Sequence, residues 1–178
     1  MTKFVALLRG INVGGNKLMK MDDLKKCFAA LGFKNVKTIL ASGNVLYEST
    51  VDDENALAKK ISEKLKAKLG HDVGIQVRSI EEIQKLADRD PFKKIKVTPD
   101  TKLYITFLPQ KPTSKLKVPY TSPEKDFKIL EVTDREICSA VVLSLGRGTV
   151  EAMGILEKEF GKNITTRNWN TVGKILKG

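Results

Sequence analysis

Cysteine, histidine and tryptophan are scarce in this chain, which holds two cysteines, one histidine and one tryptophan among 178 residues. Cys27 and Cys138 lie far apart, each inside an apolar pattern and without a histidine or cysteine at metal-ligand spacing. We therefore expect two reduced core thiols and no metal site. His71 follows a helix-ending glycine on an expected surface turn, where it has no evident catalytic partner.

Long apolar runs are also missing. The run near the N-terminus, from Phe4 to Leu8, is too short for the core of a signal peptide, and no later run approaches the length of a membrane span. We expect a cytoplasmic protein without a membrane partner. With 41% apolar and 30% charged residues, the chain can still bury a proper core, as one domain or two small ones.

Positive charge is abundant. The net charge of +11 attracts anions at long range, so a nucleotide or a nucleic acid is an expected partner class. Nine lysines lie between Lys93 and Lys128 against three acidic residues. Lysine outnumbers arginine 26 to 6, however, whereas specific phosphate contacts favour arginine. The lysine-rich stretch therefore favours a role in solubility.

The apolar pattern of residues 1–79 predicts a β-α-β-β-α-β order. Strands are expected at 3–9, 36–41, 45–48 and 73–78, and helices at 20–31 and from Asp52 or Asp53 to 69. Ser42-Gly43-Asn44 provides the turn between the second and third strands. This order is the ferredoxin-like arrangement.

Residues 80–178 predict a second, related α+β half. A short helix follows the capping pair Ser79 and Glu82, and strands are expected at 102–108, 127–132 and 137–145. Thr149 is expected to cap a helix that ends at Gly161, and a last short helix follows. All six prolines lie within 91–123, so much of that stretch is expected to be an irregular, basic connection. The predicted fold class is α+β throughout.

Two polar segments carry the candidate site residues. In the ferredoxin-like strand order, four-one-three-two, the exit of the first strand lies at the same end of the sheet as the Ser42-Gly43-Asn44 turn. The segment Arg9 to Lys17 has the glycines and the cation of a backbone nest for an anion, although its spacing matches no nucleotide-binding pattern. The candidate ligand-binding residues here are Arg9, Asn12, Gly14, Gly15, Ser42 and Asn44. The alternative is structural: the glycines serve the turn, the arginine pairs internally and the asparagines bond to backbone.

The second segment, Thr165 to Thr171, is expected to be a polar loop. Arg167, Asn168 and Trp169 could stack a base and bind its phosphate. Alternatively, Trp169 anchors the last helix in the core while Thr166 or Asn168 caps it. Gly146-Arg147-Gly148, before a helix, is a weaker candidate for anion binding.

Three strings in this sequence resemble a family of bacterial proteins, domain-of-unknown-function family 1697, along essentially the whole chain. They are Arg9 to Gly15, Ser42 to Val45 and Thr165 to Val172. The resemblance implies an α+β fold with ferredoxin-like parts. It implies no activity, cofactor or catalytic residue.

The sequence therefore predicts a protein that binds a phosphate-bearing ligand, a nucleotide or nucleic acid, in a cleft between its two halves. Two alternatives stay open. One is an enzyme that acts on a small anionic substrate by positioning and hydrogen bonding, without a metal or a covalent intermediate. The other is a purely structural role for both motifs. The sequence identifies neither the ligand nor the oligomeric state.

Overall fold

Two antiparallel sheets organise the chain, and each belongs to a unit of its own. The computed structural model describes residues 1–12, 18–145 and 148–178. Unit 1 comprises Met1–Lys85 and Val172–Gly178, and unit 2 comprises Leu86–Thr171. The predicted division at residue 79 lies close to the first of these boundaries, whereas the last residues group with unit 1. The predicted α+β class is confirmed.

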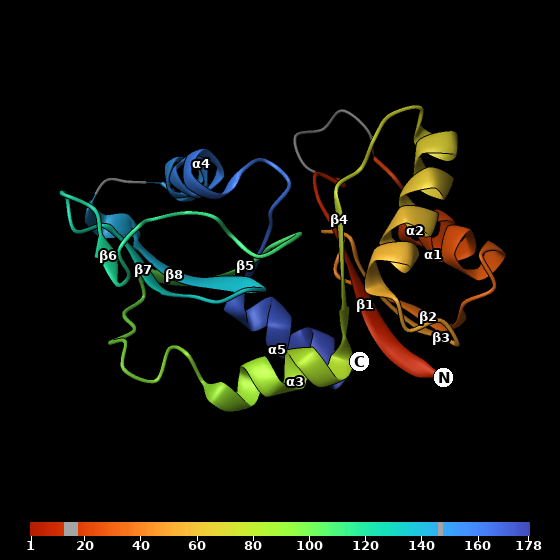
Figure 1. Cartoon of the computed structure of the whole chain (residues 1–178), viewed down its shortest axis with the longest axis horizontal. Coiled ribbons are helices and arrows are strands. Elements are labelled where there is room, and N and C mark those ends of the chain that lie inside the picture. Colours follow the sequence, from red (N-terminus) through yellow and green to blue (C-terminus); the bar gives the residue numbers. More distant parts are fainter. Residues whose placement is uncertain (13–17, 146–147) are drawn as a thin grey trace. The chain divides into compact units, whose positions relative to one another are not determined.

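Unit 1 has the β-α-β-β-α-β order that the sequence predicts. Its elements are β1 (Thr2–Leu8), α1 (Met21–Ala30), β2 (Lys34–Ile39), β3 (Asn44–Ser49), α2 (Glu54–Leu69) and β4 (Ile75–Ser79). The strands are hydrogen-bonded in the order β2-β3-β1-β4. Both helices lie on the same side of this sheet (Figure 1).

The pairing register explains which side of the sheet the helices cover. Phe4 lies opposite Tyr47 and Ala6 opposite Val45, so these four side chains share one face. They form one core with the buried faces of the two helices, which supply Leu24, Phe28, Leu57, Ile61 and Leu65. Burying these apolar side chains is the main free energy that holds the helices to the sheet.

Helix α2 has a well-defined beginning and end. The Asp53 carboxylate accepts hydrogen bonds from the backbone N–H groups of Asn55 and Ala56, at 2.9 and 3.1 Å. Gly70 ends the helix with φ +75°, where its N–H donates to the carbonyl of Lys66. Of the two aspartates that the sequence offers, Asp53 is therefore the cap.

The phenol of Tyr47 lies inside an aromatic cluster. Its ring centroid is 4.4 Å from that of Phe33, 5.4 Å from Phe28 and 5.8 Å from Phe4. The side chain is fully buried, and its hydroxyl has no hydrogen-bond partner in the described part of the chain. Burial, with a smaller contribution from the charge of Glu54, raises the pKa of this phenol well above its ordinary value.

Replacing Tyr47 by phenylalanine is expected to raise the free energy of unfolding by about 1 kcal/mol. The wild type buries a hydroxyl that makes no hydrogen bond, and the variant avoids this desolvation penalty. In the wild type, the phenol ionises more easily in the unfolded chain, so stability is intact below about pH 10 and falls as the pH rises above it. The Tyr47→Phe variant should lose less stability there. Urea unfolding at neutral and alkaline pH measures both effects, and a loss of stability at neutral pH would show that the hydroxyl has a partner.

Unit 2 contains a five-stranded sheet. Its elements are the end of α3 (Ile80–Arg89), then β5 (Thr101–Phe107), β6 (Tyr120–Thr121), β7 (Phe127–Val132), β8 (Glu136–Val142), the 3-10 turn η1 (Leu143–Leu145), α4 (Thr149–Phe160), β9 (Thr165–Asn168) and the start of α5 (Trp169–Lys177). The strand order is β6-β7-β8-β5-β9. The strand predicted over 137–145 ends earlier, because its last three residues form η1, and the sequence did not predict β6 or β9.

Helix α4 covers one face of this sheet (Figure 1). Its buried residues Ala152 and Leu156 pack in one core with Phe127, Ile137 and Val141. The prediction that Thr149 caps α4 is wrong. Gly148 occupies the cap position, and the Thr149 hydroxyl instead lies 3.0 Å from the hydroxyl of Tyr104, so its side chain joins the helix to β5.

The end of α5 belongs to unit 1. Val172 and Ile175 are buried, and the Lys37 ammonium donates to the carbonyl of Gly178 at 3.0 Å.

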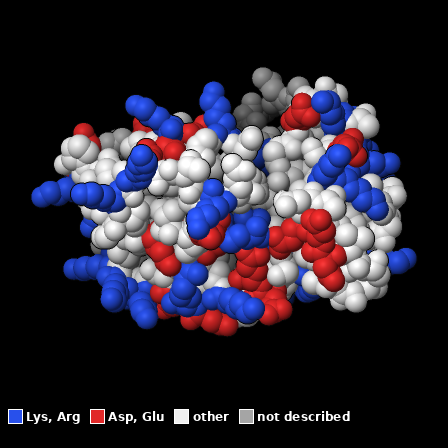
Figure 2. Space-filling model, in the orientation of Figure 1, with Lys and Arg blue, Asp and Glu red and all other residues white. Residues whose placement is uncertain are grey.

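In the described residues, no helix is both long and apolar enough to cross a membrane. Lysine and arginine side chains are interspersed with acidic ones on the face that Figure 2 shows, rather than gathered in one patch.

Candidate functional site

The exit of β1 and the β2–β3 turn are neighbours, as the strand order predicts. The N–H of Leu8 donates to the carbonyl of Gly43 at 2.8 Å. A Cβ on Gly43 would lie 3.0 Å from the Cβ of Leu8 and 3.2 Å from that of Ile11, and its φ is +82°. Both the close approach and the left-handed backbone require glycine at this position.

Asn12 joins the loop after β1 to the two segments beside it. Its Oδ1 accepts from the N–H of Met19 at 2.7 Å, while its Nδ2 donates to the carbonyls of Met19 and Ala41 at 3.0 and 3.1 Å. Its φ of 57° is one that asparagine tolerates better than most residues. The structure therefore gives Asn12 the structural role that the sequence left open. Gly14 and Gly15 lie outside the described residues.

Ser42 lies in the β2–β3 turn, and Asn44 is the first residue of β3. Asn44 is fully buried, and its Nδ2 donates to the carbonyl of Ile39 at 2.8 Å and to the hydroxyl of Ser42 at 3.1 Å. The Ser42 residue remains exposed. The buried amide thus fixes the turn and positions a hydroxyl at its surface.

The backbone of Arg9, which directly follows β1, is fixed by a hydrogen bond. Its N–H donates to the carbonyl of Gly74 at 2.8 Å. A Cβ on Gly74 would lie 3.3 Å from the Cβ of Arg9 and 3.6 Å from its Cδ, so the stem of Arg9 crosses the bare backbone of Gly74. The arginine is half-buried. Its aliphatic stem is therefore held in place by packing.

The second candidate segment is not a loop. Residues Thr165–Asn168 form β9, which pairs with β5, and α5 begins at Trp169. The prediction of a polar loop over Thr165 to Thr171 is therefore wrong. Threonine favours strands, but the segment lacks the alternation of apolar and polar residues by which strands are identified.

Arg167 points from β9 into a buried environment. It lies opposite Ile105 and is 9% exposed, and its Nη1 donates to the carbonyl of Thr166 at 3.0 Å. Burial lowers the pKa of the guanidinium to about 10, so the side chain is still a cation at neutral pH.

Asn168 and Trp169 connect β9 to α5. The Oδ1 of Asn168 accepts from the N–H of Asn170 at 2.9 Å, which is the bond of a helix cap. The half-buried indole of Trp169 packs edge-on against the buried ring of Phe92, with centroids 5.1 Å apart. These contacts are the ones that the structural alternative predicts for both residues.

The sequence did not reveal a cluster of charged groups around Cys138. The Nη2 of Arg89 lies 3.0 Å from Oε1 of Glu136 and 3.5 Å from Oε2 of Glu131, and the Cys138 thiol lies 3.9 Å from the same Glu131 oxygen. Burial raises the pKa of the thiol to about 12, so it stays neutral, like an inert core cysteine. The sequence signal was a single glutamate in each of the two strands, Glu131 in β7 and Glu136 in β8.

Two weaker candidates gain nothing from the structure. The Nδ1 of His71 lies 3.0 Å from the carbonyl of its neighbour Asp72. Of Gly146-Arg147-Gly148, only the last residue is described. Within the described ranges, no group of three or more His, Cys, Asp and Glu side chains is placed to hold a metal ion.

The fold defines an α+β protein of two units, each with its own antiparallel sheet. The chain belongs to the family described as "Protein of unknown function (DUF1697)", whose model matches residues 1–137. The Thr165 to Val172 string lies beyond the matched residues. A solved structure, that of the conserved bacterial protein SP0830 from Streptococcus pneumoniae, is similar with a TM-score of 0.73 and 20% identity, over 99% of this chain and 97% of that one. This likeness shows the fold. No curated protein matches the sequence.

Proposed function

We propose that this protein binds a phosphate-bearing ligand, a nucleotide or nucleic acid, at the end of the unit 1 sheet where Arg9 and Ser42 lie. The observation that carries the proposal is the fixed geometry of this end. The side chains of Asn12 and Asn44 make five hydrogen bonds that fix the exit of β1 and the β2–β3 turn, and packing against Gly74 holds the Arg9 stem.

A site of this kind suits an anion for two physical reasons. A guanidinium forms paired, charge-assisted hydrogen bonds to phosphate oxygens, and a serine hydroxyl can donate a third. Groups that are already ordered lose little conformational entropy on binding. The net charge of +11 adds long-range attraction for any anionic partner.

The contacts of Arg167, Asn168 and Trp169 limit where the proposed site can lie. Asn168 caps α5, Trp169 packs on Phe92 and Arg167 is buried, so each has a structural task already. We therefore place the proposed site on unit 1. A catalytic group with a shifted pKa would favour the enzyme alternative. The large pKa shifts in the described residues are those of Tyr47, Cys138 and Arg167, and burial is the main cause of each, so they do not favour an enzyme.

Replacing Arg9 by alanine is expected to lower affinity for the ligand about tenfold, because a charge-assisted bond pair is lost. The measurement is a thermal-shift screen against nucleotides and short single-stranded DNA and RNA at low and high salt, followed by titration of any ligand found. Affinity for a nucleic acid would fall steeply with salt, whereas that for a mononucleotide would fall little.

The matched control is Lys34→Ala, which removes a positive charge from an exposed residue at the start of β2, the end away from the β2–β3 turn. It should leave affinity unchanged at high salt, and Arg9→Lys should recover only part of the loss, because lysine lacks the planar fork. Equal affinities for wild type and Arg9→Ala, or no stabilisation by any member of the screen, would refute the proposal.

A further inference from the structure

A hollow of about 380 Å³ lies on the helical layer of unit 1, away from the residues of the proposed site. Helices α1 and α2 form it together. Its lining residues are Lys26, Cys27, Ala30, Lys64, Ala67 and Lys68. Among the described residues, none that lines the hollow belongs to the segment around Arg9 or to the β2–β3 turn.

Small side chains create this hollow. Where α1 and α2 face one another, Ala30, Ala67 and the buried Cys27 form its apolar lining. Larger apolar residues at these points would close the gap and bury more surface between the helices. The volume is within the usual range for a small-molecule site, at its lower end.

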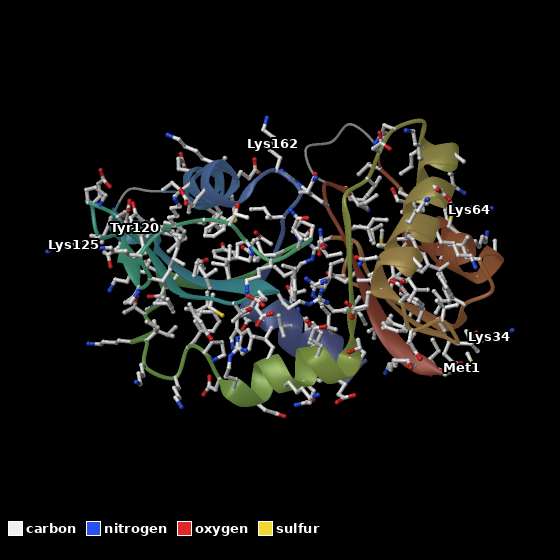
Figure 3. The ribbon with its side chains drawn as sticks, viewed as in Figure 1. Met1, Lys34, Lys64, Tyr120, Lys125 and Lys162 are labelled. Carbon is white, nitrogen blue, oxygen red and sulfur yellow. The ribbon has the colours of Figure 1, made fainter. Side chains whose placement is uncertain are left out.

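The rim of the hollow is cationic, and the described residues that line it include no carboxylate. Lys26, Lys64 and Lys68 are exposed and form no ion pair with a carboxylate of the described residues. Lys66 on the same helix differs, because it pairs with Asp72 at 3.0 Å. Figure 3 shows Lys64 projecting outward from the helical layer.

The lysines at the rim repel one another, and a bound anion would remove this repulsion. Lys64 and Lys68 are four residues apart on one helix face, where like charges repel. The negative end of the helix dipole stabilises the charge of Lys68, which lies in the last turn of α2. It gives no such stabilisation to Lys64 in α2 or to Lys26 in α1, because neither lies in a last turn. Three ammonium groups around a shallow apolar floor suit a compact ion that carries several negative charges close together.

We propose that this hollow is a second anion site, which binds a compact polyphosphate group of the pyrophosphate kind. The lysines provide point charges for its oxygens, and the small residues leave the space. The site is independent of the one at Arg9, because the two share no residue. Binding should raise the melting temperature by relieving the repulsion between the lysines.

The test is calorimetric titration of the full chain with inorganic pyrophosphate at low ionic strength. The Lys64→Gln/Lys68→Gln double variant should bind about tenfold more weakly, from two exposed charge contacts. The Ala67→Leu variant keeps every charge and fills the hollow, so it should also weaken binding. Alanine and leucine are both good helix formers, and Ala67 is exposed, so this variant is expected to fold.

The matched control is Lys25→Gln/Lys59→Gln, which removes the same charge from exposed lysines of α1 and α2 that do not line the hollow. It should bind pyrophosphate nearly as the wild type does. Circular dichroism checks that each variant is folded. Equal losses in the two lysine pairs, unchanged binding in Ala67→Leu, or no binding to the wild type would overturn the inference.

Discussion

Replacing Gly43 by valine is expected to lower the free energy of unfolding by about 3 kcal/mol or more, the largest effect of any change at the candidate site. A backbone φ of +82° costs an L residue about 1–2 kcal/mol. The new Cβ would lie 3.0 Å from the Cβ of Leu8, a fully buried residue that has no room to move aside, and such overpacking costs about 1–3 kcal/mol.

Urea unfolding measures the loss, and Gly70→Ala provides the comparison. Gly70 has a similar φ of +75°, but no atom lies within 4 Å of its Cβ position. That variant should lose only about 1 kcal/mol, from backbone strain alone. Gly43→Val with near wild-type stability would mean that the β2–β3 turn does not pack on β1 as described.

Replacing Asn12 by alanine is expected to cost about 2–3 kcal/mol. The variant loses three hydrogen bonds, leaves the backbone groups of Met19 with fewer partners and forces alanine into a positive φ. Asn12→Gly should cost less, because glycine adopts the positive φ without strain and loses only the bonds. Urea unfolding gives the two losses.

Hydrogen exchange of the Met19 amide provides a second measurement. This N–H donates to Oδ1 of Asn12, so its protection should fall in both variants while protection in α2 changes only with global stability. If alanine and glycine at position 12 cost the same, the backbone conformation contributes nothing. If neither variant changes the exchange of Met19, its N–H is not protected by the bond to Asn12.

Much of unit 1 could be predicted from the sequence, because its apolar residues follow the periods of strands and helices. Leu57, Ile61 and Leu65 recur every four residues, and Gly70 follows the last turn, so helix α2 and its end were clear. The topology then predicted that the β2–β3 turn lies beside the exit of β1, and the bond between Leu8 and Gly43 confirms it.

The remaining elements leave little trace in the pattern. Strand β9 reads Thr-Thr-Arg-Asn and holds its place by pairing with β5 rather than by an apolar face that alternates, and β6 has only two residues. The structural role of Asn12 depends on the backbone of Met19 and Ala41, which only the folded chain brings together. Sequence could identify these polar residues, but not whether their side chains face a ligand or the protein itself.

The division of the chain has a consequence for synthesis. Unit 1 is discontinuous, because Leu86–Thr171 of unit 2 is inserted between its two parts. A chain emerging from a ribosome therefore holds all the strands of the first sheet before it has residues 172–178, whose Val172 and Ile175 are buried in the finished protein. Unit 2 is therefore synthesised completely before unit 1 is complete. We expect a fragment of residues 1–85 to lack the buried side chains that 172–178 add to unit 1.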